Sequence, residues 1–459
     1  MSTATASTPD AHDIPRTRIA VLGLWHLGSV TAACLAEAGY DVVGLDPDLA
    51  VVDALGDGDP PLYEPGLEEL MAESSERLRF STDPRTLADV DCAWITFDTP
   101  VDDEDHADVE WVIGHCVRML AQLPADTLVI VSSQLPVGSV AALRERCASL
   151  HGERSLRFAC IPENLRLGRA LESFRAPDRI VAGVCDESDR DELAELLAPL
   201  HARIEWMGVE SAEMTKHALN GFLATSVAFI NETAAICESV GADAHEVARG
   251  LKSERRIGPG AYLQPGDAFA GGTLARDIGF LRDLAERNRL PAHVFAGVAE
   301  GNGAHKHWTQ RKLLELLGDD VSDGKPLTQH VVGIWGLTYK PGTDTLRRSS
   351  SVELCRWLVG AGASVQAHDP AVRALPASLA GNVELCPNPL AAVSGADVLV
   401  LCTPWPDYRD VPIEDVLAAL ARPLVVDPAG HLRAAVTACT GARYVCVGTA
   451  LNSERVSHR

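Results

Sequence analysis

The hydrophobic positions of the chain form short apolar runs that alternate with longer segments of helical periodicity. Residues 18–23 (RIAVLG) are the first apolar run, residues 25–39 have the pattern of a helix that ends in glycine, and residues 40–46 form a second run. Short apolar runs between turn residues predict buried strands. The alternation continues to residues 179–184, which predicts an α/β, doubly wound, parallel sheet with helices on both faces.

The period changes in the middle of the chain. Residues 210–240 form one long segment of helical periodicity without proline, which predicts a central helix. The apolar positions on one face of this helix include Met214, Ala218, Phe222 and Leu223. After a polar break at residues 317–329, a new strand is predicted from residue 330.

Two pairs of segments repeat in the same order. Residues 36–47 and 360–370 each combine a helix that ends in glycine, an alternating strand and a terminal Asp-Pro, and residues 89–100 resemble 396–406 in the same loose way. The repeat predicts two Rossmann-like domains joined by the central helix. The expected boundaries are a disordered lead-in (1–15), a first Rossmann-like domain (16–208), a central helical region (209–305) and a second Rossmann-like domain (306–459).

Composition narrows the classes of partner. The 459 residues carry 64 acidic and 40 basic side chains, a formal net charge of -24. Nucleic acid and anionic membranes require a cationic face, so neither is predicted as a partner. No apolar run approaches the roughly 20 residues of a membrane span, and the start, MSTATASTPDAHDIPRT, lacks the segments of a signal peptide. We therefore expect a cytoplasmic protein. Its 12 cysteines form no CxxC pair, so buried apolar roles are predicted and no metal site.

A dinucleotide-binding turn is predicted where the chain reads GLWHLG. Gly23 and Gly28 are present, and Trp25 stands where the usual pattern has its middle glycine. The turn follows a strand and opens a helix, whose amides and dipole can bind a pyrophosphate. Asp46 ends the next strand, where a carboxylate can bind the adenosine ribose and repel a 2'-phosphate. These positions predict NAD as the cofactor.

The central helix carries two polar residues that are candidates for chemistry. Lys216 is the only formally charged residue between Met214 and Asn231, and Asn220 lies four positions further along on the same helical face. The ammonium can stabilise negative charge on a substrate oxygen, while Asn220 orients the sugar or a water. The alternative is an ordinary lysine exposed at a helix end.

The order and spacing of eight motifs resemble the UDP-glucose/GDP-mannose dehydrogenase family from Arg18 to about Thr449. The motifs are PLYEPGLEEL, DTPVDDEDHADVE, LPVGS, PENLRLGRALESFRAPDRIV, KHALNGFLATSVAFINE, RIGPGAYLQPGDAFAGG, GLTYKPGTDTLRRSSS and LCTPWPDYRD. The resemblance implies an NAD-binding domain, a homodimer formed through the central helix, and a C-terminal domain that binds the nucleotide. It implies oxidation of a primary alcohol of the sugar to a carboxylate with two equivalents of NAD.

The same resemblance implies roles for individual residues. The implied catalytic set is Glu163 as general base, Lys216, Asn220, Thr273 and Asp277. The implied cofactor-binding set is Gly23, Leu27, Gly28, Asp46, Thr99, Pro100 and Arg347. The implied substrate-binding set is Leu165, Arg256 (reaching across the dimer), Tyr262, Gly271 and Lys340.

Two positions depart from the family pattern. Thr273 stands where the family has a catalytic cysteine, and Gln134 stands where it usually has a threonine that helps to position the hydrolytic water. A thiolate can attack the intermediate aldehyde, and the resulting thiohemiacetal gives up a second hydride to become a thioester, but the hydroxyl of threonine is far less acidic. Cys160, three residues before Glu163, is a conceivable displaced nucleophile, although a cysteine at a strand end more often belongs to the core.

Three functions remain open on these residues. The first is a two-electron oxidation of a UDP-sugar or related nucleotide sugar to the carbonyl. The second is a four-electron oxidation to the uronate, in which Glu163 activates water and no covalent link forms. The third is a catalytically silent nucleotide-sugar-binding or regulatory protein on the same fold. Because a silent protein has no chemical need for Glu163, Lys216, Asn220 and Asp277 together, the sequence favours an enzyme.

Overall fold

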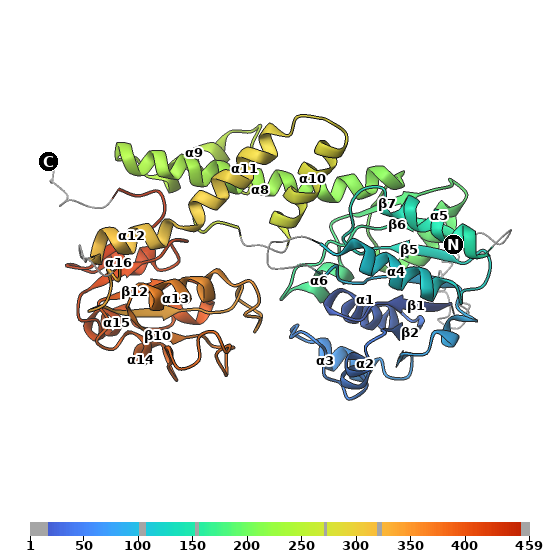
Figure 1. Cartoon of the computed structure of the whole chain (residues 1–459), viewed down its shortest axis with the longest axis horizontal. Helices are drawn as coiled ribbons and strands as arrows, with labels where there is room; N and C mark the ends of the chain where they lie inside the picture. The colour runs from blue at the N-terminus through green and yellow to red at the C-terminus, as the bar shows by residue number, and fades with distance from the viewer. Residues whose placement is uncertain (1–16, 101–106, 152–155, 270–272, 319–323, 451–459) are drawn as a thin grey trace, which may run out of the picture. The chain divides into compact units, whose positions relative to one another are not determined.

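A computed structural model gives the fold of the chain in two compact units (Figure 1). It describes residues 17–100, 107–151, 156–269, 273–318 and 324–450. The predicted lead-in, residues 1–15, lies outside the described residues. The first unit comprises residues 1–100 and 107–216, and the second comprises residues 101–106 and 217–459. No helix in the described part of the chain has the length and apolar character that crossing a membrane requires.

The first unit contains an eight-stranded sheet. In sheet order its strands are β3 (Leu78–Ser81), β2 (Asp41–Leu45), β1 (Arg18–Leu22), β4 (Cys92–Ile95), β5 (Leu128–Val131), β6 (Arg157–Cys160), β7 (Ile180–Val184) and β8 (Ile204–Gly208). The central strand β1 is buried along almost its whole length, with Ile19 opposite Val42 of β2 and Cys92 of β4. Continuous apolar runs form such strands because both faces of the sheet are covered.

One pairing departs from the predicted parallel sheet. β6 and β7 are antiparallel, with Ala159 opposite Val184, while the other neighbouring strands of this sheet are parallel. The apolar run at residues 179–184 correctly predicts a buried strand. Its hydrophobic pattern could not give the direction, because burial on both faces is the same for either orientation.

Helices cover both faces of this sheet. The first unit contains α1 (His26–Glu37), α2 (Leu49–Gly56), α3 (Leu67–Glu73), η1 (Pro84–Leu87), α4 (Val109–Leu120), α5 (Ser139–His151), α6 (Ala170–Arg175), α7 (Asp189–Leu197) and η2 (Ala198–Leu200). Buried side chains of α1, α2, α3, α6 and α7 form the core on one face. Those of α4, α5 and the start of α8 form the core on the other.

The second unit contains a six-stranded parallel sheet. In sheet order its strands are β11 (Val383–Leu385), β10 (Ser364–His368), β9 (Val331–Trp335), β12 (Val398–Leu401), β13 (Leu424–Val426) and β14 (Arg443–Val445). In both sheets the chain moves outward in two directions from the central strand pair, β1 and β4 in the first and β9 and β12 in the second. Both sheets are doubly wound, as the sequence repeat predicts, and such sheets bind ligands at the carboxyl ends of their strands.

The helices of the second unit fall into a central group and a group around the sheet. They are α8 (Val209–Val240, which begins in the first unit), α9 (Ala244–Ser253), α10 (Leu274–Arg287), α11 (His293–Lys306), α12 (Trp308–Leu317), α13 (Ser350–Gly360), α14 (Pro389–Val393), η3 (Pro406–Arg409), α15 (Ile413–Ala419) and α16 (Arg433–Ala438). α12 and α13 contribute to the core on one face of the sheet, and α14, α15 and α16 to the core on the other.

The central helix α8 buries a different face from the one that its apolar pattern suggests. Asn220, Asn231 and Ala234 are buried, whereas Phe222 is 68% exposed. Phe229, Ile236 and Val240 also lie among the exposed large hydrophobic side chains of this helix. These exposed apolar side chains of α8 are therefore uncovered in the single chain, whereas Asn220, Asn231 and Ala234 lie inside the second unit.

Candidate active site

The glycine turn joins β1 to α1 at the centre of the first sheet. Gly23 has a φ of +94°, a conformation that favours glycine. A Cβ atom on Gly28 would lie 1.7 Å from the carbonyl oxygen of Gly23, so no side chain fits there. These two glycines allow the first turn of α1 to lie directly against the end of β1. The turn therefore has the close backbone approach that a dinucleotide site requires.

Trp25 replaces the middle glycine without straining the turn. Its φ of -68° is an ordinary value for an L-residue, and its side chain is 38% exposed. No side chain caps this end of α1, and the first turn of the helix contains no acidic residue. The helix N-terminus is therefore suited to an anionic group. The turn fits the pyrophosphate of a dinucleotide despite the tryptophan.

Asp46 follows β2, next to the same turn. Its Oδ2 accepts a hydrogen bond from the amide of Leu24 at 2.7 Å, and its Oδ1 accepts one from the amide of Asp48 at 3.0 Å. Burial raises the pKa of Asp46 above its ordinary value, although the two amide hydrogen bonds act in the opposite direction. Each carboxylate oxygen has a second lone pair. A half-buried acceptor with this spare capacity suits a ribose hydroxyl.

Three further predicted cofactor residues lie in the first unit. Leu27 is in the first turn of α1, and Thr99 and Pro100 follow β4. The hydroxyl of Thr99 donates to the carbonyl of Gln134 at 2.7 Å, which joins the loops after β4 and β5. The structure thus places these residues at or just beyond the carboxyl ends of neighbouring strands.

Glu163 and Lys216 form an ion pair. Glu163 lies in the loop after β6, and its Oε1 is 2.9 Å from Nζ of Lys216 in the second turn of α8. The Oε2 atom accepts a hydrogen bond from the amide of Leu165, also at 2.9 Å. The side chains are only 16% and 11% exposed, so the predicted alternative of an exposed lysine is wrong. In such a pair the ammonium can neutralise negative charge on a substrate oxygen, and the carboxylate can accept a proton.

A second polar cluster lies inside the second unit. The carboxylate of Asp277 in α10 is fully buried, and it pairs with Asn220 Nδ2 and with His217 Nδ1, the latter at 2.9 Å. Thr273 immediately precedes α10, and its side chain does not cap the helix. Asp277 thus holds two side chains of α8 in fixed positions.

The predicted substrate residues of the second unit are spread over several loops. Tyr262 is 57% exposed. Arg256 is mostly exposed and pairs with Glu254, its Nε lying 3.0 Å from Oε1. Lys340 and the exposed Arg347 both belong to the long loop between β9 and α13. Gly271 lies outside the described residues.

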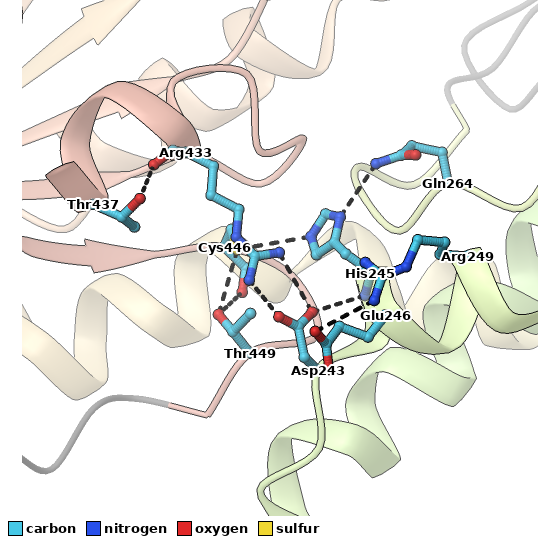
Figure 2. A network of polar contacts seen from close by, with 9 residues as sticks. All are labelled: Asp243, His245, Glu246, Arg249, Gln264, Arg433, Thr437, Cys446 and Thr449. Carbon is cyan, nitrogen blue, oxygen red and sulfur yellow. Dashed lines mark hydrogen bonds and ion pairs between the residues drawn. The ribbon is translucent and has the colours of Figure 1, made fainter. Parts of the chain in front are cut away.

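The cysteines that could serve as alternative nucleophiles are buried. Burial raises the pKa of Cys160 far above its ordinary value, so its thiol remains protonated and belongs to the core. Figure 2 shows a second buried cysteine, Cys446, whose Sγ lies 3.8 Å from Nε2 of His245. Its pKa is raised to about 11, with burial as the main cause. In the same network Arg433, the first residue of α16, pairs with Asp243 at the start of α9, so the network joins the start of α9 to α16 and to the segment after β14.

Three residues with close polar contacts were not predicted from the sequence. His217 contacts Asp277, and His26 of the glycine turn contacts the buried Glu64. Glu64 lies within the motif PLYEPGLEEL and His217 directly follows Lys216, so proximity to motifs was the only signal. Within the described residues, no group of three or more His, Cys, Asp or Glu side chains could hold a metal ion.

Comparisons with known proteins cover most of the chain. Residues 17–201 match the NAD binding domain of the UDP-glucose/GDP-mannose dehydrogenase family, residues 210–304 its central domain and residues 333–434 its UDP binding domain. A UDP-glucose 6-dehydrogenase of Pseudomonas aeruginosa is 34% identical over 426 residues, which span 89% of this chain and 92% of that protein. One from Rhizobium meliloti is 32% identical over 441 residues, or 94% and 99% of the two chains.

Solved structures agree with these matches. A UDP-glucose dehydrogenase from the hyperthermophilic archaeon Pyrobaculum islandicum superposes with a TM-score of 0.85 at 30% identity, covering 97% of this chain and 100% of that one. A UDP-D-ManNAc dehydrogenase from Pyrococcus horikoshii gives a TM-score of 0.81 at 22% identity, covering 94% and 99% of the two chains. The second likeness supports the fold alone.

Proposed function

The chain belongs to the UDP-glucose/GDP-mannose dehydrogenase family, and from that premise we propose that it oxidises the hydroxymethyl group or a ring hydroxyl of a UDP-sugar without forming a thioester. It is an NAD-dependent nucleotide-sugar dehydrogenase. The observation that carries the proposal is the ion pair between Glu163 and Lys216, two nearly buried side chains 2.9 Å apart. Such a pair suits the removal of a hydroxyl proton next to a developing negative charge.

NAD, when bound, is the acceptor of the hydride. In the proposal Gly23 and Gly28 leave room for the pyrophosphate at the N-terminus of α1, and Asp46 accepts hydrogen bonds from the adenosine ribose. Leu27, Thr99 and Pro100 would line the same edge of the first sheet, and Arg347 would meet an anionic group. The absence of a cap or an acidic residue at the start of α1 supports this assignment.

The chain's own residues handle the proton. As the substrate hydroxyl loses its proton to Oε1 of Glu163, the ammonium of Lys216 stabilises the charge that develops on the oxygen. Asn220 would hold a sugar hydroxyl or a water. Asp277 is fully buried and pairs with Asn220, so we assign it a positioning role in place of direct contact with substrate.

Thr273 in place of the family's cysteine removes the covalent route of oxidation from the proposal. A threonine hydroxyl has no population of anion near neutral pH that compares with a thiolate, so the proposal contains no covalent aldehyde adduct. Thr273 would donate a hydrogen bond to the reacting oxygen. The product is then either the carbonyl compound or, when Glu163 activates water and the hydrated aldehyde is oxidised again, the uronate.

The experiment is to incubate the purified protein with NAD and a panel of UDP-, GDP- and dTDP-sugars. NADH formation is followed by absorbance, and the products are identified by mass spectrometry. One NADH per sugar with loss of two hydrogens identifies the carbonyl compound. Two NADH per sugar identifies the uronate. Saturable binding of UDP-sugars without formation of NADH would contradict the proposed oxidation and favour a nucleotide-sugar-binding protein.

We also propose that the protein is a homodimer formed through α8. Phe222, Phe229 and Ile236 are spaced seven residues apart, so they lie along one face of the helix, and each is at least half exposed. A second copy would cover this stripe, and the exposed Arg256 would be available to the partner's substrate. The test is the mass in solution by light scattering, which should fall to that of the monomer in Phe229→Glu.

A further inference from the structure

A buried carboxylate of the first unit has no part in the proposed chemistry. Glu64 lies between α2 and α3, and its side chain is only 1% exposed. A buried charge is costly unless it is fully hydrogen-bonded. Oε2 lies 2.9 Å from Nε2 of His26 and accepts from the amide of Gly168 at 2.8 Å, while Oε1 accepts from the amide of Ala170 at 2.7 Å.

The partners of Glu64 belong to two functional segments. His26 is the first residue of α1 and part of the glycine turn. Gly168 and Ala170 end the loop that begins after β6, and Ala170 is also the first residue of α6. α1 lies against both α3 and α6 (Figure 1). A single carboxylate therefore connects the cofactor turn to the loop that carries Glu163.

The loop is held at both of its ends. Near its start Glu163 is fixed by Lys216 and by the amide of Leu165. Near its end Glu64 accepts hydrogen bonds from two backbone amides, those of Gly168 and Ala170. Although burial alone would raise the pKa of Glu64, the hydrogen bonds from His26, Ala170 and Gly168 hold that pKa below its ordinary value. The carboxylate is thus the form that holds the loop.

His26 is the link that a cofactor can influence. Its side chain is 14% exposed, whereas that of Glu64 is almost completely enclosed. A ligand that binds the N-terminus of α1 fixes the backbone from which the imidazole projects. Such a ligand then favours the arrangement in which His26 is hydrogen-bonded to Glu64 and Glu64 accepts the amides of Gly168 and Ala170 in the loop. A ligand shifts an equilibrium only by binding one arrangement more tightly than the other.

We propose that His26 and Glu64 are positioning residues that couple occupancy of the cofactor turn to the order of residues 163–170, and hence to the affinity for nucleotide sugar. The proposal rests on the proposed function for the identity of the two ligands. Thermodynamic linkage makes the coupling reciprocal, so cofactor and sugar strengthen each other's binding by the same factor.

The test uses calorimetry with UDP-glucose and NADH, a pair that cannot react with each other. In the wild-type protein NADH should strengthen UDP-glucose binding by roughly fivefold or more. His26→Ala should lose this strengthening while its affinity for UDP-glucose alone changes by less than about twofold, and His26→Gln, whose amide can still donate to Glu64, should restore part of it.

A matched control breaks another polar contact between the same two helices. Arg175 of α6 pairs with Glu37 at the end of α1, with Nε 2.7 Å from Oε2, on an exposed surface. Arg175→Ala should keep the full effect of NADH. Equal strengthening in His26→Ala and the wild type would overturn the proposal, as would a wild-type protein in which NADH does not change the affinity for UDP-glucose.

Hydrogen exchange separates this proposal from the proposed function. In the wild-type protein NADH should slow the exchange of amides in residues 163–170, and in His26→Ala it should not. This readout needs neither turnover nor a bound sugar. If UDP-glucose fails to bind, the proposed substrate is wrong, but protection by NADH that depends on His26 still supports the coupling. Unchanged exchange in the wild type would overturn it.

Discussion

The two sheets share a motif at the carboxyl ends of their central strands, but its aspartate has different hydrogen-bond partners in each sheet. Each has an aspartate after the strand next to its central strand, Asp46 after β2 and Asp369 after β10, and each has a glycine with positive φ after the central strand. Oδ2 of Asp369 accepts from the amide of Leu337 at 2.7 Å and from Nε1 of Trp405 at 3.1 Å. Asp369 is buried, whereas Asp46 is half-buried and each of its oxygens takes one amide.

We infer that this difference separates the cofactor carboxylate proposed for Asp46 from a structural one. Oδ2 of Asp369 already accepts hydrogen bonds from the loop after β9 and from a tryptophan in the loop after β12, and its Oδ1 accepts one from the amide of Ala371 at 2.9 Å. The carboxylate of Asp46 keeps lone pairs for a ribose. A repeat in the sequence therefore identifies the common architecture, and only the hydrogen-bond partners tell which copy can bind a dinucleotide.

The largest expected effect tests whether the Glu163–Lys216 pair of the first unit carries the chemistry. Lys216→Ala should lower kcat by roughly a thousandfold, because the charge on the reacting oxygen loses its ammonium. The measurement is NADH formation at saturating substrate. The matched control is Lys312→Ala, which breaks another nearly buried pair, with Glu238 of the second unit at 3.2 Å, and should keep kcat within about twofold of the wild type.

The next effect concerns stability. Asp369→Asn should lower the free energy of unfolding by roughly 2–3 kcal/mol, because the amide turns a donor toward the backbone N–H of Leu337 or Thr338. Urea denaturation measures this change. The Kd for NAD should stay within about twofold of the wild-type value. A large loss of NAD affinity without loss of stability would reverse the roles assigned to the two aspartates.

The converse substitution should affect binding. Asp46→Asn should raise the Kd for NAD roughly tenfold, because the charged acceptor for the ribose is lost, while the amide oxygen of asparagine can still accept from one backbone N–H. Calorimetric titration with NAD measures the effect. An unchanged Kd in this variant would remove Asp46 from the cofactor site.

The smallest expected effect is at Thr273. Thr273→Ala should lower kcat about fivefold, since one neutral hydrogen bond to the reacting oxygen is lost. Thr273→Ser keeps the hydroxyl and should retain most of the activity. A loss as large as that of Lys216→Ala would give Thr273 a role in catalysis that a hydrogen bond does not explain.

Much of the fold could be predicted from local pattern. The strands at residues 18–22 and 331–335 are apolar runs between turn residues, and the helix at 209–240 has no proline to interrupt it. Gly23, Gly28 and Asp46 could be named as candidates because a nucleotide turn has a fixed spacing. The antiparallel direction of β7 could not be predicted, because a strand buried on both faces has the same pattern in either direction.

Contacts between distant segments could not be predicted. Trp405 reaches Asp369 across 36 positions of sequence, and Glu64 reaches Gly168 across 104. No local spacing encodes such pairs. The exposure of Phe222 was missed for a related reason, because periodicity identifies an apolar face but not whether this chain or another one covers it.

The central claim is that Glu163 and Lys216 support oxidation without a covalent intermediate. The most direct measurement is the mass of the intact protein, quenched in acid during turnover with NAD and a UDP-sugar that yields NADH. The account predicts NADH formation from a protein whose mass is unchanged. A protein heavier by the mass of the bound sugar nucleotide would contradict it.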